Sequence, residues 1–185
     1  ETLRYFIMSS HYRSPLNFSD DNLDLAKSSL TRLYTAMRGL SASDAAMDEV
    51  SQRFDFEKRF NAALDDDFNT SIALSILFEL AKLVNSEREK DIDQANALAQ
   101  LLQKLGGYIG ILQTDADSFL KHTPQGGTKK RGVDLADEDI DAKIKQRNEA
   151  KGNKDFALSD QIRDELIDLG VILEDSANGT SWRRG

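Results

Sequence analysis

Apolar residues recur at three- and four-residue steps through most of the first 120 positions. Side chains at this spacing share one face of an α-helix, so the pattern predicts amphipathic helices. The clearest stripe follows Ser19, a good N-cap residue, and ends at Gly39. Before it we expect a short buried helix at residues 3–8 and a loop from His11 to Phe18.

Three further stripes follow before residue 120. The first spans residues 50–64, and the second begins at Asn69 or Thr70. The third begins at Asp91 or Asp93 and continues to Leu112. Gly106-Gly107 and Gly110 interrupt the last stripe, where we expect a bend or close packing. Four amphipathic stripes joined by short links predict an antiparallel helical bundle.

The pattern changes after residue 120. Residues 121–136 include a long stretch without apolar side chains, which we interpret as a flexible linker and a domain boundary. Two helical stripes follow at residues 140–147 and 156–169, and Gly170 ends the second. The helical spacing of apolar residues then ends, because residues 171–173 are apolar in succession. Asn178-Gly179 is a turn signal, so we predict a β-hairpin here. The expected fold is mainly α, an antiparallel helical bundle followed by a small helical domain with a short β-hairpin.

Several kinds of chemistry find no support in the sequence. Cysteine is absent, and His11 and His122 have no metal-ligating partner at a recognisable spacing. There is no phosphate-binding glycine loop, and no apolar run long enough to span a membrane. The triplet Asp65-Asp66-Asp67 precedes a predicted helix start, where acidic side chains are favourable, so we prefer a structural role to a Mg²⁺ site. We therefore expect no catalytic, cofactor-binding or metal-ligating residue in this chain.

Two segments carry residue types that bind nucleic acids. His11, Tyr12 and Arg13 can contact phosphates or stack on bases, although a packed loop explains them equally well. The tail contains aromatic, carboxylate and arginine side chains that can stack on unpaired bases or bond their amino groups. By composition alone we favour a small core there, with Trp182 and Phe156 packing the hairpin on the helices.

The net charge of −8 argues against a nucleic-acid partner, because such proteins are usually basic. The acidity, however, is uneven. Residues 1–120 hold 12 basic and 19 acidic side chains, whereas residues 121–185 hold 12 and 13. The nearly neutral tail leaves room for local phosphate contacts.

Four segments, in order, resemble one family, the cysteinyl-tRNA synthetases. They are residues 3–19 (LRYFIMSSHYRSPLNFS), 64–70 (LDDDFNT), 154–157 with 159–164 (KDFA and SDQIRD), and 170–175 with 179–184 (GVILED and GTSWRR). The resemblance implies an enzyme that activates cysteine with ATP and attaches it to tRNA(Cys). Its catalytic domain, with a zinc ion, would lie before Glu1, so ATP and zinc are expected there and no cofactor in this segment.

The resemblance also implies a division of labour. Residues 1–18 would end the stem-contact region, 19–120 would form a bundle supporting the tRNA, 121–136 a linker, and 137–185 the anticodon-binding domain. By position, Asp160 and Asp175 would read the bases of a GCA anticodon, Phe156 would stack on them, and Lys151 would contact a phosphate. The further tRNA contacts implied are His11, Arg13, Arg163, Trp182, Arg183 and Arg184, the last four as backbone contacts or hairpin anchors. We expect a cytoplasmic monomer that binds no membrane.

Two alternatives stay open. A related ligase that joins cysteine to an amino sugar would lack residues 137–185, so their presence disfavours it. A helical interaction module that has lost its enzyme would keep the fold without catalysis.

Overall fold

The computed structural model describes residues 1–41, 44–121, 135–176 and 179–184. The chain divides into two compact units, residues 1–119 and 120–185, which are described separately below. The predicted linker at 121–136 falls almost wholly on residues 122–134, which lie outside the described residues.

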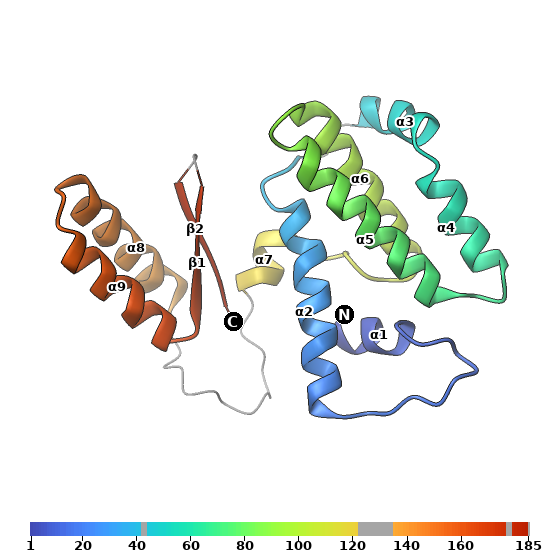
Figure 1. Cartoon of the computed structure of the whole chain (residues 1–185), viewed down its shortest axis with the longest axis horizontal. Helices are drawn as coiled ribbons and strands as arrows, with labels where there is room; N and C mark the ends of the chain where they lie inside the picture. The colour runs from blue at the N-terminus through green and yellow to red at the C-terminus, as the bar shows by residue number, and fades with distance from the viewer. Residues whose placement is uncertain (42–43, 122–134, 177–178, 185) are drawn as a thin grey trace. The chain divides into compact units, whose positions relative to one another are not determined.

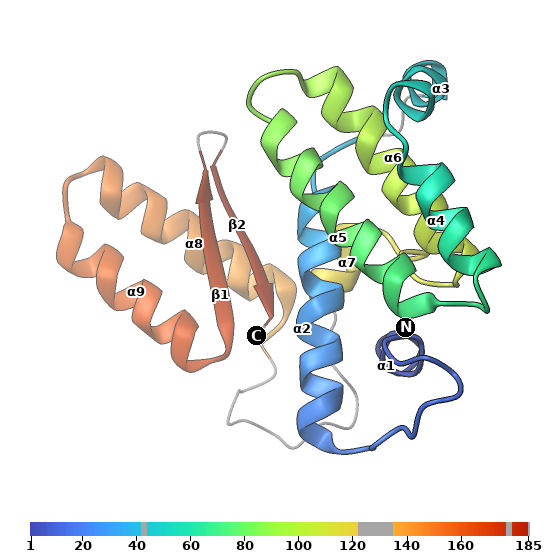
Figure 2. The ribbon, with the colours of Figure 1, turned by 45° about the vertical axis from the view of Figure 1, so that its right-hand side comes forward.

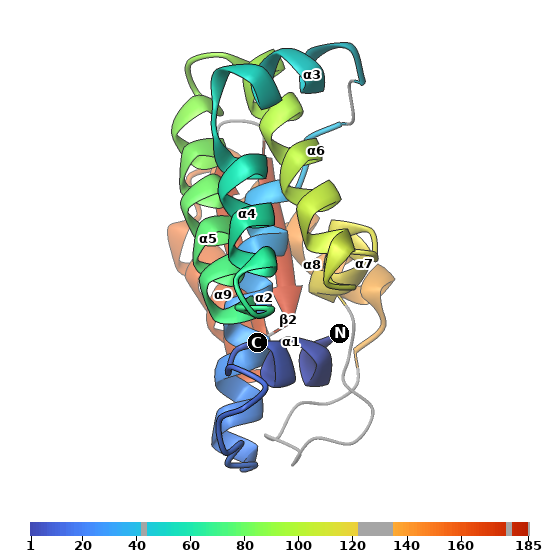
Figure 3. The ribbon, with the colours of Figure 1, turned by 90° about the vertical axis from the view of Figure 1, so that its right-hand side faces the viewer.

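The first unit is a bundle of helices. Its elements are α1 (Thr2–Met8), α2 (Asp20–Met37), α3 (Asp44–Arg53), α4 (Phe56–Asp65), α5 (Thr70–Glu87), α6 (Ile92–Tyr108) and the first residues of α7 (Ala116–Lys121). Helices α4, α5 and α6 lie side by side, and α2 packs against α5 (Figures 1 and 2). The short α1 runs across α2 (Figure 3). The predicted bundle is therefore confirmed.

Helix starts in this unit are set by side-chain caps. Ser19, Asn69 and Asp91 each accept a hydrogen bond from a backbone N–H three residues further on. Such caps satisfy amides that the first helical turn leaves without a partner. The core behind these starts is formed largely by leucines with no exposed surface: Leu30, Leu33, Leu77, Leu80, Leu98, Leu101, Leu102 and Leu105.

Two predicted helices of the bundle were wrong in extent. The stripe at residues 50–64 forms two helices, because the chain breaks at Phe54 and Asp55, and Phe56 starts α4 as a buried residue. The last stripe leaves the helix at Tyr108 instead of continuing to Leu112.

The turn that follows α6 explains why glycines stand at positions 106 and 110. Gly110 has φ +72°, and the amide of Ile111 donates to the carbonyl of Gly106 at 3.0 Å. A Cβ atom on Gly106 would lie 2.8 Å from a methyl carbon of Leu112. Ile111 and Leu112 are therefore buried by a turn that folds back on the helix. The bend or close packing expected at these glycines is confirmed, whereas the expected continuation of the helical stripe to Leu112 is wrong.

The second unit pairs two helices with a hairpin (Figure 1). Its elements are α8 (Asp137–Gly152), α9 (Phe156–Asp168), β1 (Val171–Ser176) and β2 (Gly179–Arg184). The strands are antiparallel, with Leu173 opposite Trp182 and Asp175 opposite Thr180. Gly170, at φ +77°, follows α9 and allows the chain to reverse into β1. Both predicted helices and the hairpin are confirmed.

A small apolar cluster holds this unit together. It consists of Ile140, Ile144, Ile162, Leu166, Val171 and Trp182. Trp182 is 2% exposed, and its indole N–H donates to Asp141 at 2.7 Å. The bonded indole N–H removes the cost of burying a polar group in so small a core.

Candidate nucleic-acid interface

Asp175 is the centre of the most connected polar cluster in the second unit. Arg147 on α8 donates to both oxygens of its carboxylate, from Nη1 to Oδ1 at 3.0 Å and from Nη2 to Oδ2 at 2.8 Å. Thr180, opposite on β2, donates to Oδ1 at 2.7 Å, and Lys151 donates to Oδ2 at 3.1 Å. The cluster ties α8 to the outer end of the hairpin.

These contacts fix the charge of Asp175. The hydrogen bonds from Arg147, and then from Thr180, hold the pKa of the Asp175 carboxyl well below its usual range. In the same cluster, the pKa of Arg147 is raised by its bond to Asp175 and by the nearby charge of Asp160 on α9. Asp175 is thus an ionised acceptor at neutral pH, and its side chain is still 48% exposed.

This lowered pKa predicts how stability depends on pH. Asp175 should stabilise the fold above the ordinary aspartate pKa and lose that contribution as the pH falls through its lower folded value. We expect the difference in unfolding free energy between wild type and Asp175→Asn to stay constant from about pH 7 to about pH 5 and to shrink below about pH 4. Urea unfolding at a series of pH values measures this difference, with Asp168→Asn, an exposed position on α9, as the control. A difference that already declines near pH 6 would contradict the assignment.

Three of the residues implied by the resemblance join Asp175 at one end of the unit. The turn between α8 and α9 lies at the same end as the close of β1 and the start of β2 (Figures 1 and 2). Lys151 belongs to the last turn of α8, whereas Phe156 and Asp160 belong to the first turns of α9. Phe156 is 63% exposed, so its ring is available for stacking on a base. The site therefore combines an aromatic surface, two carboxylates and a cation.

The cap of α9 fixes the position of Phe156. Asp155, the residue before it, accepts a hydrogen bond from the amide of Leu158 at 3.1 Å, and Lys154 has φ +62°. Because Ile162 and Leu166 point into the core, a helix starting here leaves Phe156 outside it. The expectation that Phe156 packs the hairpin on the helices is therefore wrong.

The other tail residues serve the fold. Trp182 is core, as the composition suggested, and so it presents no free ring to a base. Arg183 donates to Glu174 across the hairpin at 2.9 Å. Arg184 donates to the carbonyls of Lys121 and Leu135, at 3.0 and 2.9 Å, which ties together the two ends of the predicted linker. Arg163, by contrast, is exposed on α9.

Arg147 is the residue that sequence reasoning missed as part of the site. It continues the stripe of Ile140 and Ile144 and is 3% exposed. A cation at a core position of a helix requires a buried or half-buried carboxylate nearby, since an unpaired buried charge is very costly. The sequence therefore indicated that Arg147 needs a carboxylate partner, but the spacing of apolar residues could not identify that partner as Asp175.

In the first unit, the loop after α1 gathers around a different carboxylate. Tyr12 donates to Asp67 Oδ1 at 2.7 Å and Arg13 to the same oxygen at 3.2 Å, while His11 Nε2 lies 3.7 Å from Oδ2. Asp67 and Phe68 both have positive φ, at 55° and 51°. Asp66 and Asp67 lie in the turn between α4 and α5, and not in the first turn of α5, where acidic side chains were expected to be favourable. Asp67 also holds the loop in place. His11 and Arg13 are thus brought together, in a unit separate from the Asp175 cluster.

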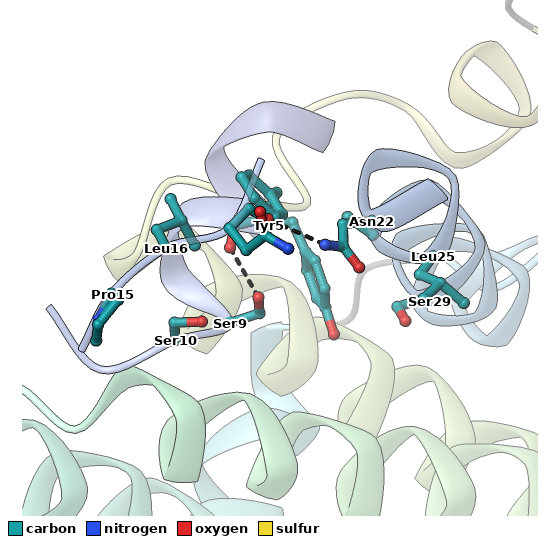
Figure 4. A pocket seen from close by; sticks show the side chains of 11 residues that line it. Tyr5, Ser9, Ser10, Pro15, Leu16, Asn22, Leu25 and Ser29 are labelled. Atoms are coloured by element: carbon teal, nitrogen blue, oxygen red, sulfur yellow. Dashed lines mark hydrogen bonds between the residues drawn. The ribbon is translucent and has the colours of Figure 1, made fainter. Parts of the chain in front are cut away.

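An open groove lies beside this loop, between α1 and α2 (Figure 4). Its walls carry Tyr5, Ser9, Leu16, Asn22 and Leu25, and Asn22 donates to the carbonyl of Asn17 at 3.0 Å. The described lining is apolar or uncharged, so the groove itself supplies no charge for phosphate or metal binding. Within the described residues, no cluster of His, Cys, Asp and Glu suits a metal ion, and no helix is long and apolar enough to cross a membrane.

Comparison with known proteins relates both units to one group of enzymes. Residues 59–113 match the DALR domain, and residues 134–183 match the cysteinyl-tRNA ligase anticodon binding domain. Over all 185 residues the chain is 50% identical to the cysteine–tRNA ligase of Thioalkalivibrio sulfidiphilus. It is 49% and 48% identical, over 184 residues, to those of Yersinia pseudotuberculosis and Yersinia enterocolitica. The chain spans about 38% of the length of each of these relatives.

Proposed function

The chain belongs to the cysteine–tRNA ligase family, and we propose that it is the tRNA-binding part of such an enzyme. The observation that carries the proposal is the exposed cluster of Phe156, Asp160, Asp175 and Lys151 inside the region matched by the anticodon binding domain. In this proposal residues 137–185 read the anticodon, and the chain itself performs no chemistry.

The chemistry of the cluster suits unpaired bases. An exposed phenylalanine ring offers a stacking surface for any base. Carboxylates accept hydrogen bonds from the amino groups that guanine, cytosine and adenine carry. All three bases of a GCA anticodon have such a group, so Asp160 and Asp175 are the proposed base readers. Lys151 and the exposed Arg163 supply positive charge for the phosphates beside them.

The bundle has a supporting role in this proposal. Residues 1–18 would end a region that contacts the tRNA stem, and residues 19–120 would brace the tRNA. Arg13 is 68% exposed in its side chain although it bonds to Asp67, so its guanidinium can still meet a phosphate. His11 stacks on Tyr12 beside it, with ring centroids 4.9 Å apart. Arg183, Arg184 and Trp182 act as hairpin anchors here.

The whole enzyme would attach cysteine to tRNA(Cys), using ATP and a zinc ion held by another part of the polypeptide. The match to an anticodon binding domain favours this over a cysteine:amino-sugar ligase, whose substrate has no anticodon. We further propose that the enzyme acts as a monomer in the cytoplasm, where tRNA is charged.

Binding of short RNA tests the proposal. We expect the 185-residue chain to bind an anticodon stem-loop with GCA about tenfold more tightly than one with a single altered anticodon base, since each lost base contact costs about 1–3 kcal/mol. Binding should be weak and should fall as salt is raised. Fluorescence anisotropy at several salt concentrations measures both effects, with a stem-loop altered only in its stem as control. Equal affinity for all stem-loops, or no binding at low salt, would refute the proposal.

A further inference from the structure

Arg147 is a buried charged residue whose ion-pair partner lies at the surface. Its side chain is 3% exposed, whereas that of its partner Asp175 is 48% exposed. Nε of Arg147 is buried without a hydrogen-bond partner among the described residues. Burying a guanidinium under these conditions costs stability that an apolar residue at the same place would not. The fold alone therefore gives little reason for an arginine here.

The carboxylate of Asp175, which pairs with Arg147, already accepts as many hydrogen bonds as it can. A carboxylate has about four lone-pair positions. Within the described residues, Oδ1 accepts from Arg147 and Thr180, and Oδ2 accepts from Arg147 and Lys151. A base amino group can bond to Asp175 only by replacing one of these donors.

The three residues that donate to the Asp175 carboxylate differ in how easily a base can displace them. Arg147 is locked by burial and by two parallel bonds, and Thr180 is held opposite Asp175 by the strand register. Lys151 makes one bond at 3.1 Å, and its side chain is 42% exposed on a flexible stem. Lys151 is therefore the donor that an incoming base replaces, at Oδ2.

We propose that Arg147 is a positioning residue for base reading, which holds Asp175 in one orientation so that only the position occupied by Lys151 is exchanged for RNA. This inference rests on the proposed function and adds the mechanism of its selectivity. The planar fork of arginine fixes both the place and the rotation of the carboxylate, which the single ammonium of a lysine does not. A base amino group must then approach from one direction, which is what distinguishes one base from another.

Substitutions at both ends of the pair test the inference in the 185-residue chain. The measured quantity is selectivity, the affinity for the GCA stem-loop divided by that for stem-loops altered at each anticodon position. We expect Asp175→Asn to lower selectivity about tenfold at one position, and Arg147→Lys to lower it by a similar factor at the same position. The double variant should be no less selective than Asp175→Asn alone, because Arg147 acts through Asp175. Lys143→Met, which removes the α8 partner of Glu165, is the matched control and should leave selectivity unchanged.

A pH profile separates positioning from a merely structural role. The charged groups that contact Asp175 are Arg147 and Lys151 from α8, while the charge of Asp160 on α9 acts on Arg147. Hydrogen bonds from Arg147 make the largest contribution to lowering the pKa of Asp175. Selectivity of the wild type should stay constant from about pH 7 to about pH 5, because Asp175 remains ionised. In Arg147→Met the pKa of the carboxyl rises toward the ordinary aspartate value, so selectivity should begin to fall between about pH 5 and about pH 4, where the wild type is still unaffected. Arg147→Lys, which keeps a cation, should show the smaller pH dependence of the two variants.

The outcomes are distinct. If the wild type does not discriminate between stem-loops, the proposed function fails. If the wild type discriminates and Asp175→Asn does not, but Arg147→Lys keeps full selectivity, the positioning inference alone is overturned. It is equally overturned if the losses of the two single variants add in the double variant. Should Arg147→Met fail to fold, as judged by circular dichroism, Arg147→Lys and the double variant still decide the question.

Discussion

Replacing Trp182 by alanine is expected to unfold residues 120–185 while residues 1–119 remain folded. Trp182 is the largest member of a small core, in which the described residues contribute six buried side chains with Leu135, Leu158 and Leu173 packed against them. Truncating a buried tryptophan costs about 3–5 kcal/mol, and a core of this size rarely supplies more than about 3–5 kcal/mol in total. The substitution also leaves the Asp141 carboxylate without the indole N–H that it accepts from.

Hydrogen exchange followed by mass spectrometry measures this effect for each unit separately. Amides of α8, α9 and the hairpin should lose protection, whereas those of α5 and α6 should keep it. Trp182→Phe retains most of the apolar volume and should give an intermediate result. Unchanged protection of α8 and α9 in Trp182→Ala would show that the cluster around Trp182 is not the core of the unit.

Replacing Phe156 by alanine should have the opposite character, a large loss of RNA affinity without a loss of stability. The ring is 63% exposed, so its removal leaves no cavity. Stacking of one base on an aromatic side chain contributes about 1–3 kcal/mol, so affinity for the GCA stem-loop should fall about 5- to 150-fold. Because a ring face accepts any base, stem-loops with altered anticodons should lose affinity by a similar factor.

The exposed Ile167 provides the matched control for this experiment. It lies on the same helix, is 50% exposed, and belongs to the last turns of α9 instead of the first. Ile167→Ala should change neither RNA affinity nor thermal stability, and Phe156→Tyr should retain binding. Wild-type affinity in Phe156→Ala would exclude a stacking role for this ring.

Of the two large aromatic side chains of residues 120–185, Trp182 is buried and Phe156 is exposed, and composition alone did not distinguish them. Both follow apolar patterns, and both were first assigned to the core. Phe156 is excluded because the cap at Asp155 starts the helix with that residue outside the Ile162 and Leu166 face. Trp182 is enclosed because its position on β2, opposite Leu173, faces the helices.

The family resemblance identified most of the site residues, whereas the structure identified the contacts between them. The resemblance implied Asp175, Asp160, Phe156 and Lys151 from their order along the chain, and the structure brings these residues to one end of the unit. It gave no role to Arg147, because the need for a buried cation arises only when the hairpin is placed on α8. For the same reason, the sequence did not predict that Asp67 bonds to Tyr12 and Arg13.

The sequence by itself determined most of the helices, the caps at Ser19, Asn69 and Asp91, and the hairpin, because apolar spacing and cap chemistry act between residues within a few positions of each other. It did not predict α7 or the cap of α9 at Asp155. Only the tertiary structure decided where the stripe at residues 50–64 breaks, which aromatic is buried, and which charges pair. Arg147 and Asp175 are 28 positions apart, and Arg13 and Asp67 are 54. Pairings at such separations depend on how whole elements pack, and local periodicity carries no information about that packing.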